Sequence, residues 1–342
     1  MNSKVIIIAE AGVNHNGDFD NAKKLILAAS NAGADYVKFQ TFKADKLVSR
    51  DAKKAQYQKS NLNKDGDTQY DMLKKLEMSE QWHYDLFKYA NECGIKFLST
   101  GFDEDSIDFL DSLTIDLFKA PSGEITNKPY LEHLAKKAKP IILSTGMATI
   151  EEIGEAISIL IENKITKENI TILHCNTEYP TPMKDVNLLA MNFIRDKFGV
   201  SVGYSDHTEG IEVPIAAVAL GAKVIEKHFT IDKAMDGPDH KASLDPSELL
   251  KMVKAIRNIE LAISGSGKKE VSESEMKNII VARKSIHLNN DMKAGQQIHK
   301  KDLVMKRPGD GISPMEIETI IGKSIVQDLL KDHKLELKDL KN

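Results

Sequence analysis

Short apolar runs rich in β-branched residues alternate along most of the chain with segments of helical spacing. Each run is typical of a buried strand, and the runs cover residues 5–9, 36–40, 96–99, 116–119, 141–144, 171–174, 200–203 and 223–226. A segment with helical periodicity follows each run; residues 20–31, for example, place Leu25, Ile26 and Ala29 on one face and end before Gly33. Strands that alternate with helices predict a parallel sheet covered by helices.

This repeat predicts an α/β fold in which the sheet closes into a barrel. Eight strand–helix units over about 250 residues match a (β/α)8 (TIM) barrel, and an open doubly wound sheet is the alternative for the same pattern. A helix from Pro246 to about Ile263 completes the pattern. We therefore assign residues 1–264 to a barrel domain.

The remaining residues have a different pattern of apolar and polar positions. Residues 265–269 (GSGKK) lack the spacing of a phosphate-binding loop and follow a helix rather than a strand, so we interpret residues 265–280 as a linker. From residue 281 to residue 342, short apolar runs are separated by glycine and proline. We expect a second, small domain of short strands there.

One insertion interrupts the barrel pattern. Residues 43–76, after the second strand, are mostly polar and longer than an ordinary strand–helix loop. Two interpretations stay open, a lid over the catalytic end of the barrel and a solvated excursion without a role in the site.

Composition limits the class of protein. The chain has 342 residues, 41% hydrophobic and 29% charged, a net charge of −4 and a pI near 6.2, which describe a soluble globular protein and argue against nucleic-acid or membrane-surface binding. Cys93 and Cys175 are the only cysteines, so no disulfide framework is predicted. No apolar run is long enough to span a membrane or form a signal peptide. We expect a cytoplasmic protein.

Polar side chains follow nearly every predicted strand, where the active site of a (β/α)8 barrel lies. Two of these strands end at His207 and His228, with a helix across residues 210–221 between them. Two imidazoles at one end of a sheet predict a divalent metal site. Because waters and substrate must complete the shell, Mn²⁺ or Mg²⁺ fits better than a structural zinc. We expect Asp206 and Glu226 to orient the two imidazoles as hydrogen-bond acceptors.

A second group of strand-end residues combines cations with hydroxyl groups. Its members are Lys38, Lys119, Ser122, Ser144 and Ser205. Such a group predicts a phosphate site; the alternative for each lysine is that it extends to solvent. Two carboxylates, Glu10 and Asp239, are candidates for binding hydroxyls or transferring protons; a turn-forming role is the alternative for Asp239, which follows a proline in a loop.

Seven segments carry a resemblance to one family. They are residues 10–15 (EAGVNH), 37–41 (VKFQT), 119–124 (KAPSGE), 143–147 (LSTGM), 174–180 (HCNTEYP), 203–208 (GYSDHT) and 226–230 (EKHFT). Together, and in this order, they resemble the sialic acid synthase family. Residues 304–311 (VMKRPGDG) resemble that family's C-terminal antifreeze-like (SAF) domain, which residues 281–342 would form.

The resemblance implies an activity. The family condenses phosphoenolpyruvate with an N-acylated mannosamine-type sugar, with C–O cleavage and release of phosphate, to give a nine-carbon α-keto acid. The resemblance therefore implies an N-acetylneuraminate synthase that uses N-acetylmannosamine. The alternative is a legionaminate synthase, or less favourably a pseudaminate synthase, that uses a diacetamido-trideoxyhexose.

The resemblance also implies roles for individual residues. His207 and His228 match metal ligands, for Mn²⁺ first and Mg²⁺ or Co²⁺ as alternatives. Glu10 matches a position that faces the sugar and is our candidate for handling protons, so we expect Glu10, His207 and His228 to be the catalytic residues. The positions that match the phosphoenolpyruvate site are Lys38, Thr100, Lys119, Ser122, Ser144, Thr177 and Ser205. The positions that match the sugar site are Gln40, Tyr179, Asp239 and Arg307. Arg307 matches an arginine that the small domain places over the neighbouring subunit's active site, which implies a domain-swapped homodimer.

Two other classes of function stay open on the residues alone. A Schiff-base aldolase would use Lys38 or Lys119 as its nucleophile. A sugar- or ice-binding protein would use the small domain as its functional part. Two departures from the family pattern, Gly101 where proline is common and Thr177 where some members have asparagine, remove no metal or phosphate ligand.

Overall fold

The computed structural model describes residues 4–55 and 68–342, so part of the predicted 43–76 insertion, residues 56–67, lies outside the described residues. The chain divides into two compact units, Met1–Gly265 and Ser266–Asn342. Among the described residues, no helix combines the length and apolarity that a membrane span requires.

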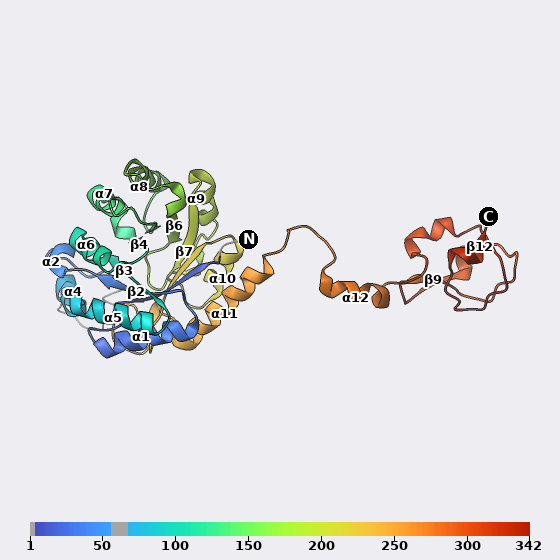
Figure 1. Ribbon diagram of the computed structural model, residues 1–342, viewed down its shortest axis with the longest axis horizontal. Helices are drawn as coiled ribbons and strands as arrows, with labels where there is room; N and C mark the ends of the chain where they lie inside the picture. Colours follow the sequence, from blue (N-terminus) through green and yellow to red (C-terminus); the bar gives the residue numbers. More distant parts are fainter. Residues whose placement is uncertain (1–3, 56–67) are drawn as a thin grey trace. The chain divides into compact units, whose positions relative to one another are not determined.

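The first unit is a closed barrel of parallel strands (Figure 1). Its strands are β1 (Ile6–Gly12), β2 (Tyr36–Thr41), β3 (Lys96–Gly101), β4 (Phe118–Ala120), β5 (Ile141–Ser144), β6 (Ile170–Cys175), β7 (Ser201–Asp206) and β8 (Val224–His228). Each strand pairs with the next, and β8 pairs with β1, which closes the sheet. The predicted (β/α)8 barrel is confirmed, and the open doubly wound sheet is excluded.

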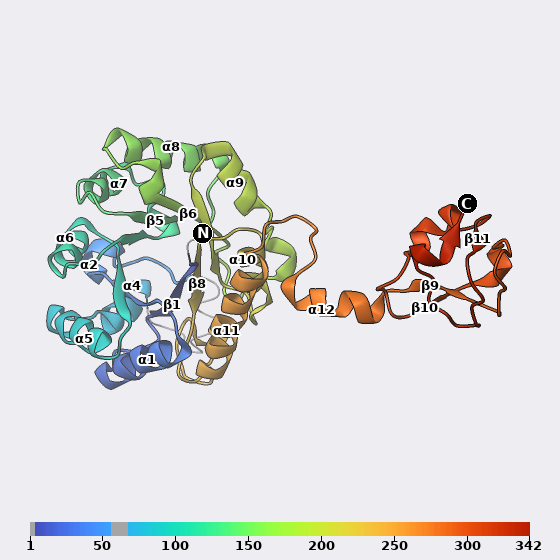
Figure 2. The same ribbon diagram turned by 45° about the vertical axis from the view of Figure 1, so that its right-hand side comes forward.

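Helices surround the barrel, as Figure 2 shows. They are α1 (Phe19–Ala32), α2 (Ala44–Leu47), α4 (Gln69–Leu76), α5 (Glu80–Glu92), α6 (Glu104–Ser112), α7 (Lys128–Ala135), α8 (Ile150–Glu162), α9 (Ala190–Phe198), α10 (Glu212–Ala219) and α11 (Pro246–Ala262). In α1 the predicted apolar face is buried. The side chain of Asp18 caps its first turn, and Gly33, at a φ of 79°, ends it because glycine adopts left-handed backbone conformations without steric cost.

Most strands extend beyond the ends that their apolar runs predict, and β7 and β8 do so by two or more residues. Strand β7 continues to Asp206 and β8 to His228, and the pairing of Ser205 with Glu226 and of Asp206 with Lys227 keeps the ladder intact. Backbone hydrogen bonding does not depend on side-chain polarity, so the polar residues that build the site are part of the sheet. Position 203 has to be glycine, because a Cβ there would lie 2.2 Å from the carbonyl oxygen of Val224.

The described part of the 43–76 insertion is packed rather than solvated. Helices α2 and α4 contribute Ala44, Met72, Leu73 and Leu76 to an apolar cluster separate from the barrel core. A capping box of Thr68 and Asp71 starts α4. The interpretation as a solvated excursion is therefore wrong for the described residues of this segment.

The second unit contains a helix and two small antiparallel sheets. Its elements are α12 (Glu273–Ala282), β9 (Ser285–Leu288), β10 (Leu303–Lys306), β11 (Ser324–Ile325) and β12 (Leu340–Lys341), with β9 paired to β10 and β11 to β12. A compact apolar core that includes Ile286, Ile298 and Ile325 holds the strands together. Helix α12 begins inside the predicted 265–280 linker, where Ser272 and Glu275 form a capping box that the sequence analysis overlooked.

Candidate active site

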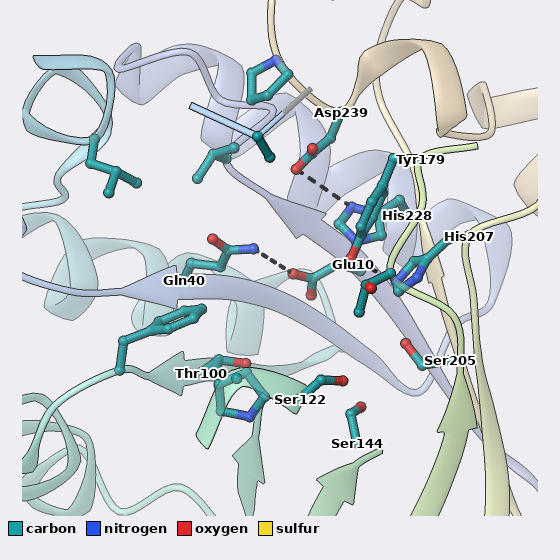
Figure 3. A pocket seen from close by; sticks show the side chains of 18 of the residues that line it. Glu10, Gln40, Thr100, Ser122, Ser144, Tyr179, Ser205, His207, His228 and Asp239 are labelled. Carbon is teal, nitrogen blue, oxygen red and sulfur yellow. Dashed lines mark hydrogen bonds and ion pairs between the residues drawn. The ribbon is translucent and has the colours of Figure 1, made fainter. Parts of the chain in front are cut away.

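A cavity of about 530 Å³ opens at the carboxyl ends of the barrel strands. It is lined by every predicted site residue of the barrel, namely Glu10, Lys38, Gln40, Thr100, Lys119, Ser122, Ser144, Thr177, Tyr179, Ser205, His207, His228 and Asp239. Figure 3 shows the cavity from close by, with all of these labelled except Lys38, Lys119 and Thr177. Arg307 belongs to the second unit, where its Nε donates a hydrogen bond to the carbonyl oxygen of Ala282 at 3.0 Å.

Strand register brings the first catalytic candidates together. Glu10 on β1 is paired with Lys38 on β2 and with His228 on β8. Lys38 is buried, and its Nζ lies 2.7 Å from Glu10 Oε2 and donates to Thr100 Oγ1 at 2.9 Å. Burial disfavours the ammonium, but the nearby Glu10 and Glu226 carboxylates outweigh burial and raise the pKa of Lys38. Lys38 is therefore a fixed cation in the cavity and does not extend to solvent.

Lys119 is buried in the same cavity but has a weaker set of partners. Its Nζ donates to the carbonyl oxygen of Ala120 at 2.8 Å and lies 3.9 Å from Glu226 Oε1. Burial lowers the pKa of Lys119, and Glu226 opposes the shift. An incoming anion would therefore stabilise the Lys119 ammonium, as expected of a group that binds a phosphate or a carboxylate.

Glu226 is the residue whose role the sequence analysis misassigned. Within the part of the chain that the structure describes, no hydrogen bond or ion pair joins it to an imidazole. It lies between the two lysines, 3.6 Å from Lys38 Nζ, and accepts a hydrogen bond from Ser205 Oγ at 2.9 Å. Burial raises the pKa of a carboxyl, but Lys119 and Lys38 outweigh this effect and lower the pKa of Glu226. A signal was present, because side chains two apart on a strand share a face and Glu226 is two residues before His228.

Asp206, the other predicted orienting acceptor, also has a different role. Its carboxylate accepts hydrogen bonds from Lys227 Nζ at 2.6 Å and from Thr208 Oγ1, and the Asp206–Lys227 pair is completely buried. Each member of the pair directly precedes a site histidine. The pair therefore joins the ends of β7 and β8 and fixes the backbone from which the two imidazoles project.

Other groups orient the histidines. The Nδ1 of His207 is hydrogen-bonded to the carbonyl oxygen of Asn176, so Nδ1 carries the proton and Nε2 is left as the acceptor atom. The Tyr179 hydroxyl lies 3.0 Å from that Nε2, and the ring centroids of His207 and His228 are 5.4 Å apart. His228 Nδ1 is buried without a hydrogen-bond partner, 4.0 Å from Asp239 Oδ2 (Figure 3).

These two imidazoles have the chemistry that a divalent cation requires. Burial lowers the pKa of His207 to about 4. Burial, together with the nearby His207 ring, holds the pKa of His228 well below its usual value. Both rings are therefore neutral at pH 7, so that each has one unprotonated ring nitrogen whose lone pair could bind a metal. Within the described residues no group of three or more His, Cys, Asp or Glu side chains could hold a metal, so water or substrate would have to supply the other ligands.

Two carboxyls in the cavity titrate near neutrality. Burial raises the pKa of Glu10 to about 7 against the opposing effect of Lys38, and burial alone raises the pKa of Asp239 to about 7. Gln40 Nε2 contacts Glu10 Oε1 at 3.4 Å (Figure 3). Groups with such pKa values can exchange protons at the pH of a cell.

Hydroxyl and backbone donors line the side of the cavity next to Lys119. Ser122 Oγ accepts a hydrogen bond from the backbone N–H of Gly146 at 2.9 Å, and Ser144 Oγ is buried without a partner. A Cβ at position 146 would lie 2.5 Å from Thr177 Cγ2, so glycine is needed for these segments to approach. An unpartnered hydroxyl in the same cavity as a buried ammonium fits an anion.

Apolar residues line the remaining part of the cavity. Those that pack together in one apolar cluster are Val13, Leu47, Val48, Met72, Leu73, Leu76 and Phe102, and we call them the apolar wall. Most come from α2, α4 and the residues next to these helices, in the insertion after β2. The sequence analysis missed this wall, since the insertion is polar overall and only its folding gathers the apolar side chains.

The comparisons with known proteins agree with this arrangement. Residues 25–269 match the model of the NeuB family, and residues 283–341 match the model of the SAF domain. The chain is 52% identical to the N,N'-diacetyllegionaminic acid synthase of Campylobacter jejuni, over 96% of this chain and 98% of that enzyme. It is 36% identical to the human N-acetylneuraminate-9-phosphate synthase, over 95% of this chain and 90% of that enzyme.

A solved structure gives the same result for the fold. The crystal structure of the N-acetylneuraminic acid (sialic acid) synthetase of Leptospira borgpetersenii in complex with citrate matches with a TM-score of 0.70 and 33% identity, over 81% of this chain and 91% of that one. The predicted SAF domain and the resemblance drawn from the motifs are both confirmed. This chain belongs to the NeuB family.

Proposed function

We propose that this protein condenses phosphoenolpyruvate with a 2,4-diacetamido-trideoxyhexose to form N,N'-diacetyllegionaminic acid and phosphate. One observation carries the choice of acceptor, namely the 52% identity, over nearly the full length of both chains, to a synthase of that name. The identity to the human N-acetylneuraminate-9-phosphate synthase is 36%. The motifs put N-acetylmannosamine first, whereas the identities favour the alternative acceptor.

The charged part of the cavity suits phosphoenolpyruvate. In this proposal the Lys38 and Lys119 ammonium groups, with the hydroxyls of Thr100, Ser122 and Ser144, bind its phosphate and carboxylate. Thr177 and Ser205 complete the binding site. Fixed cations and donors in a buried site stabilise charge without the reorganisation that water would need. They also hold C3 of the enol within reach of the acceptor.

The reaction then balances in three steps. C3 of phosphoenolpyruvate attacks the aldehyde carbon of the open-chain sugar, the new C–C bond forms, and the aldehyde oxygen takes up a proton. Water adds to the resulting cationic C2, and Glu10, with a pKa of about 7, accepts the proton that this water loses. The C–O bond to phosphate breaks while the proton of the C2 hydroxyl passes to the departing phosphate, which releases phosphate and leaves the 2-keto acid. Gln40, Tyr179 and Asp239 bind the hydroxyl and amide groups of the sugar.

His207 and His228 are the residues that would hold a divalent cation, with Mn²⁺ favoured and Mg²⁺ or Co²⁺ as alternatives. A cation bound there would supply Lewis-acid polarisation of the aldehyde oxygen. Two further parts of the proposal come from the family resemblance: a domain-swapped homodimer, and a role for Arg307 in binding the acyl group of the sugar. We also place the reaction in the cytoplasm, where both free cysteines would stay reduced.

An acceptor panel tests the function. Purified protein would be given phosphoenolpyruvate, Mn²⁺ and, in turn, 2,4-diacetamido-2,4,6-trideoxymannose, N-acetylmannosamine and the acceptor of pseudaminate synthesis, with phosphate release as the readout. We expect the highest kcat/KM with the diacetamido-trideoxymannose and no phosphate release without a sugar. A higher value with N-acetylmannosamine would assign the protein to sialic acid synthesis instead.

A second experiment separates the metal-assisted condensation from a Schiff-base aldolase. We expect EDTA to abolish turnover, Mn²⁺ to restore it, and His207→Ala or His228→Ala to remain folded but inactive at saturating Mn²⁺. Full activity of either variant would contradict the metal assignment. Covalent trapping of substrate on Lys38 or Lys119 by borohydride would instead support the aldolase. The sugar- or ice-binding alternative predicts no turnover with any acceptor.

A further inference from the structure

The apolar wall faces a cavity whose other groups are almost all charged or hydrogen-bonding. Met72, Leu73 and Leu76 on α4, together with Leu47 and Val48 at the end of α2, line the same cavity as the lysines and histidines. Apart from Gln69, no polar side chain of the described part of the insertion lines it. An apolar surface inside a polar site has to contact some part of a substrate or remain in water at a cost.

Phosphoenolpyruvate has no large apolar group that could bind to such a surface. It consists of a phosphate, a carboxylate and a short enol, and the cations that suit these groups lie on strands β2 and β4. The wall therefore belongs to the acceptor. A polyhydroxylated sugar would place hydroxyls against it and lose their hydration without replacement hydrogen bonds. A sugar that carries methyl groups would bury them there instead.

The wall is held in place without a substrate. The backbone N–H of Ala44 donates to Glu77 Oε1 at 2.6 Å, and the Tyr70 hydroxyl donates to Asp45 at 2.8 Å, so both ends of α4 are tied to α2. Phe42 and Phe102 pack edge to face with their ring centroids 6.0 Å apart, which joins the wall to the ends of β2 and β3. A preformed surface can select between acceptors at little conformational cost.

We propose that the apolar wall determines the acceptor of this enzyme by binding the methyl groups of a deoxygenated, doubly N-acetylated hexose: the C6 methyl and the acetamido methyl at C4. The proposal rests on the proposed function and adds the residues that carry it. Leu47 and Val48 are the members best suited to a test, because both are only partly buried and tolerate a polar side chain better than α4 does. Gln69 is placed to receive the amide of the acetamido group.

The experiment compares two acceptors in the full-length protein. Leu47→Asn and Val48→Thr would be assayed with 2,4-diacetamido-2,4,6-trideoxymannose and with N-acetylmannosamine, and the ratio of the two kcat/KM values compared with that of the wild type. We expect the ratio to fall about tenfold in Leu47→Asn and about threefold in Val48→Thr, mostly through the KM of the diacetamido sugar. The KM of phosphoenolpyruvate should stay within about twofold of the wild type.

Leu250→Asn is the matched control. Leu250 is half exposed on α11 and outside the cavity, so the same substitution there should leave the ratio unchanged. If Leu47→Asn does not fold, Val48→Thr, which keeps the side-chain shape, decides alone. An unchanged ratio in folded variants, or an equal loss with both sugars, overturns the role of the wall while the proposed function stands. A wild type that prefers N-acetylmannosamine overturns both.

Discussion

Two parts of one cavity differ in chemistry and in origin. The charged cluster of Glu10, Lys38, Lys119 and Glu226 is built from barrel strands, and all four side chains are buried. The apolar wall is built mostly from an insertion between a strand and its helix. In the charged cluster, pairing between the side chains and binding of an anionic substrate offset the cost of burying the charges. The apolar wall is a surface that can bind only apolar groups favourably.

The difference suggests that the strand ends and the strand–helix insertion of this barrel have different functions. Strand ends position catalytic groups rigidly, whereas strand–helix loops can change without disturbing the sheet. In this protein the groups proposed to bind phosphoenolpyruvate and to handle protons lie on strand ends and just beyond them. The groups proposed to distinguish one sugar from another lie in the insertion. Three experiments test this division.

The largest effect should come from Lys38→Met. It removes the cation that pairs with Glu10 at 2.7 Å and with Glu226 at 3.6 Å, and leaves two buried carboxylates facing each other. We expect kcat/KM to fall about a thousandfold with every acceptor and the free energy of unfolding to fall by about 3 kcal/mol, measured by phosphate release and urea unfolding. Adding Glu10→Gln should restore much of the stability but no activity. A loss confined to one acceptor would contradict the division.

A complementation experiment brings in the second unit. If Arg307 acts on a neighbouring subunit, Lys38→Met and Arg307→Ala chains should each have little activity alone but complement when refolded together. A hybrid dimer would then contain one intact site, so the mixture should recover about a quarter of wild-type activity. Arg283→Ala, which changes another arginine of the second unit, is the control. This variant should be active without complementation. No recovery in a mixture shown to contain hybrid dimers would contradict the domain swap.

Asp239 is the last residue to test, and its effect is expected in the pH dependence of stability. Its folded-state pKa is about 7, raised from 3.8 by burial. A carboxyl whose pKa is raised on folding stabilises the fold at pH values below the pKa of the unfolded state. This contribution is lost as the pH rises through the folded-state pKa of about 7. Relative to Asp239→Asn, metal-free wild type should therefore lose stability between about pH 4 and pH 7, on the order of 4 kcal/mol in total. Parallel stability curves for the two proteins, measured by urea unfolding, would show that Asp239 is not shifted.

The limits of sequence reasoning are clearest at the residues next to the histidines. Adjacency in sequence suggested that Asp206 and Glu226 would orient His207 and His228. Strand alternation instead turns Glu226 into the cavity toward Lys38 and Lys119, and pairs Asp206 with Lys227 away from it. The residue that orients His207 is Asn176, through its backbone carbonyl. A backbone contact of this kind leaves no trace in residue types.

The sequence by itself determined the closed barrel, the second small domain and nearly all the polar residues of the cavity. These follow from periodicities and strand ends that are local properties of the chain. Only the tertiary structure decided which carboxylate pairs with which cation, because pairing depends on register and on which face each side chain takes. It alone also showed the apolar wall, since apolar side chains scattered through a polar insertion become one surface only when α2 and α4 pack together.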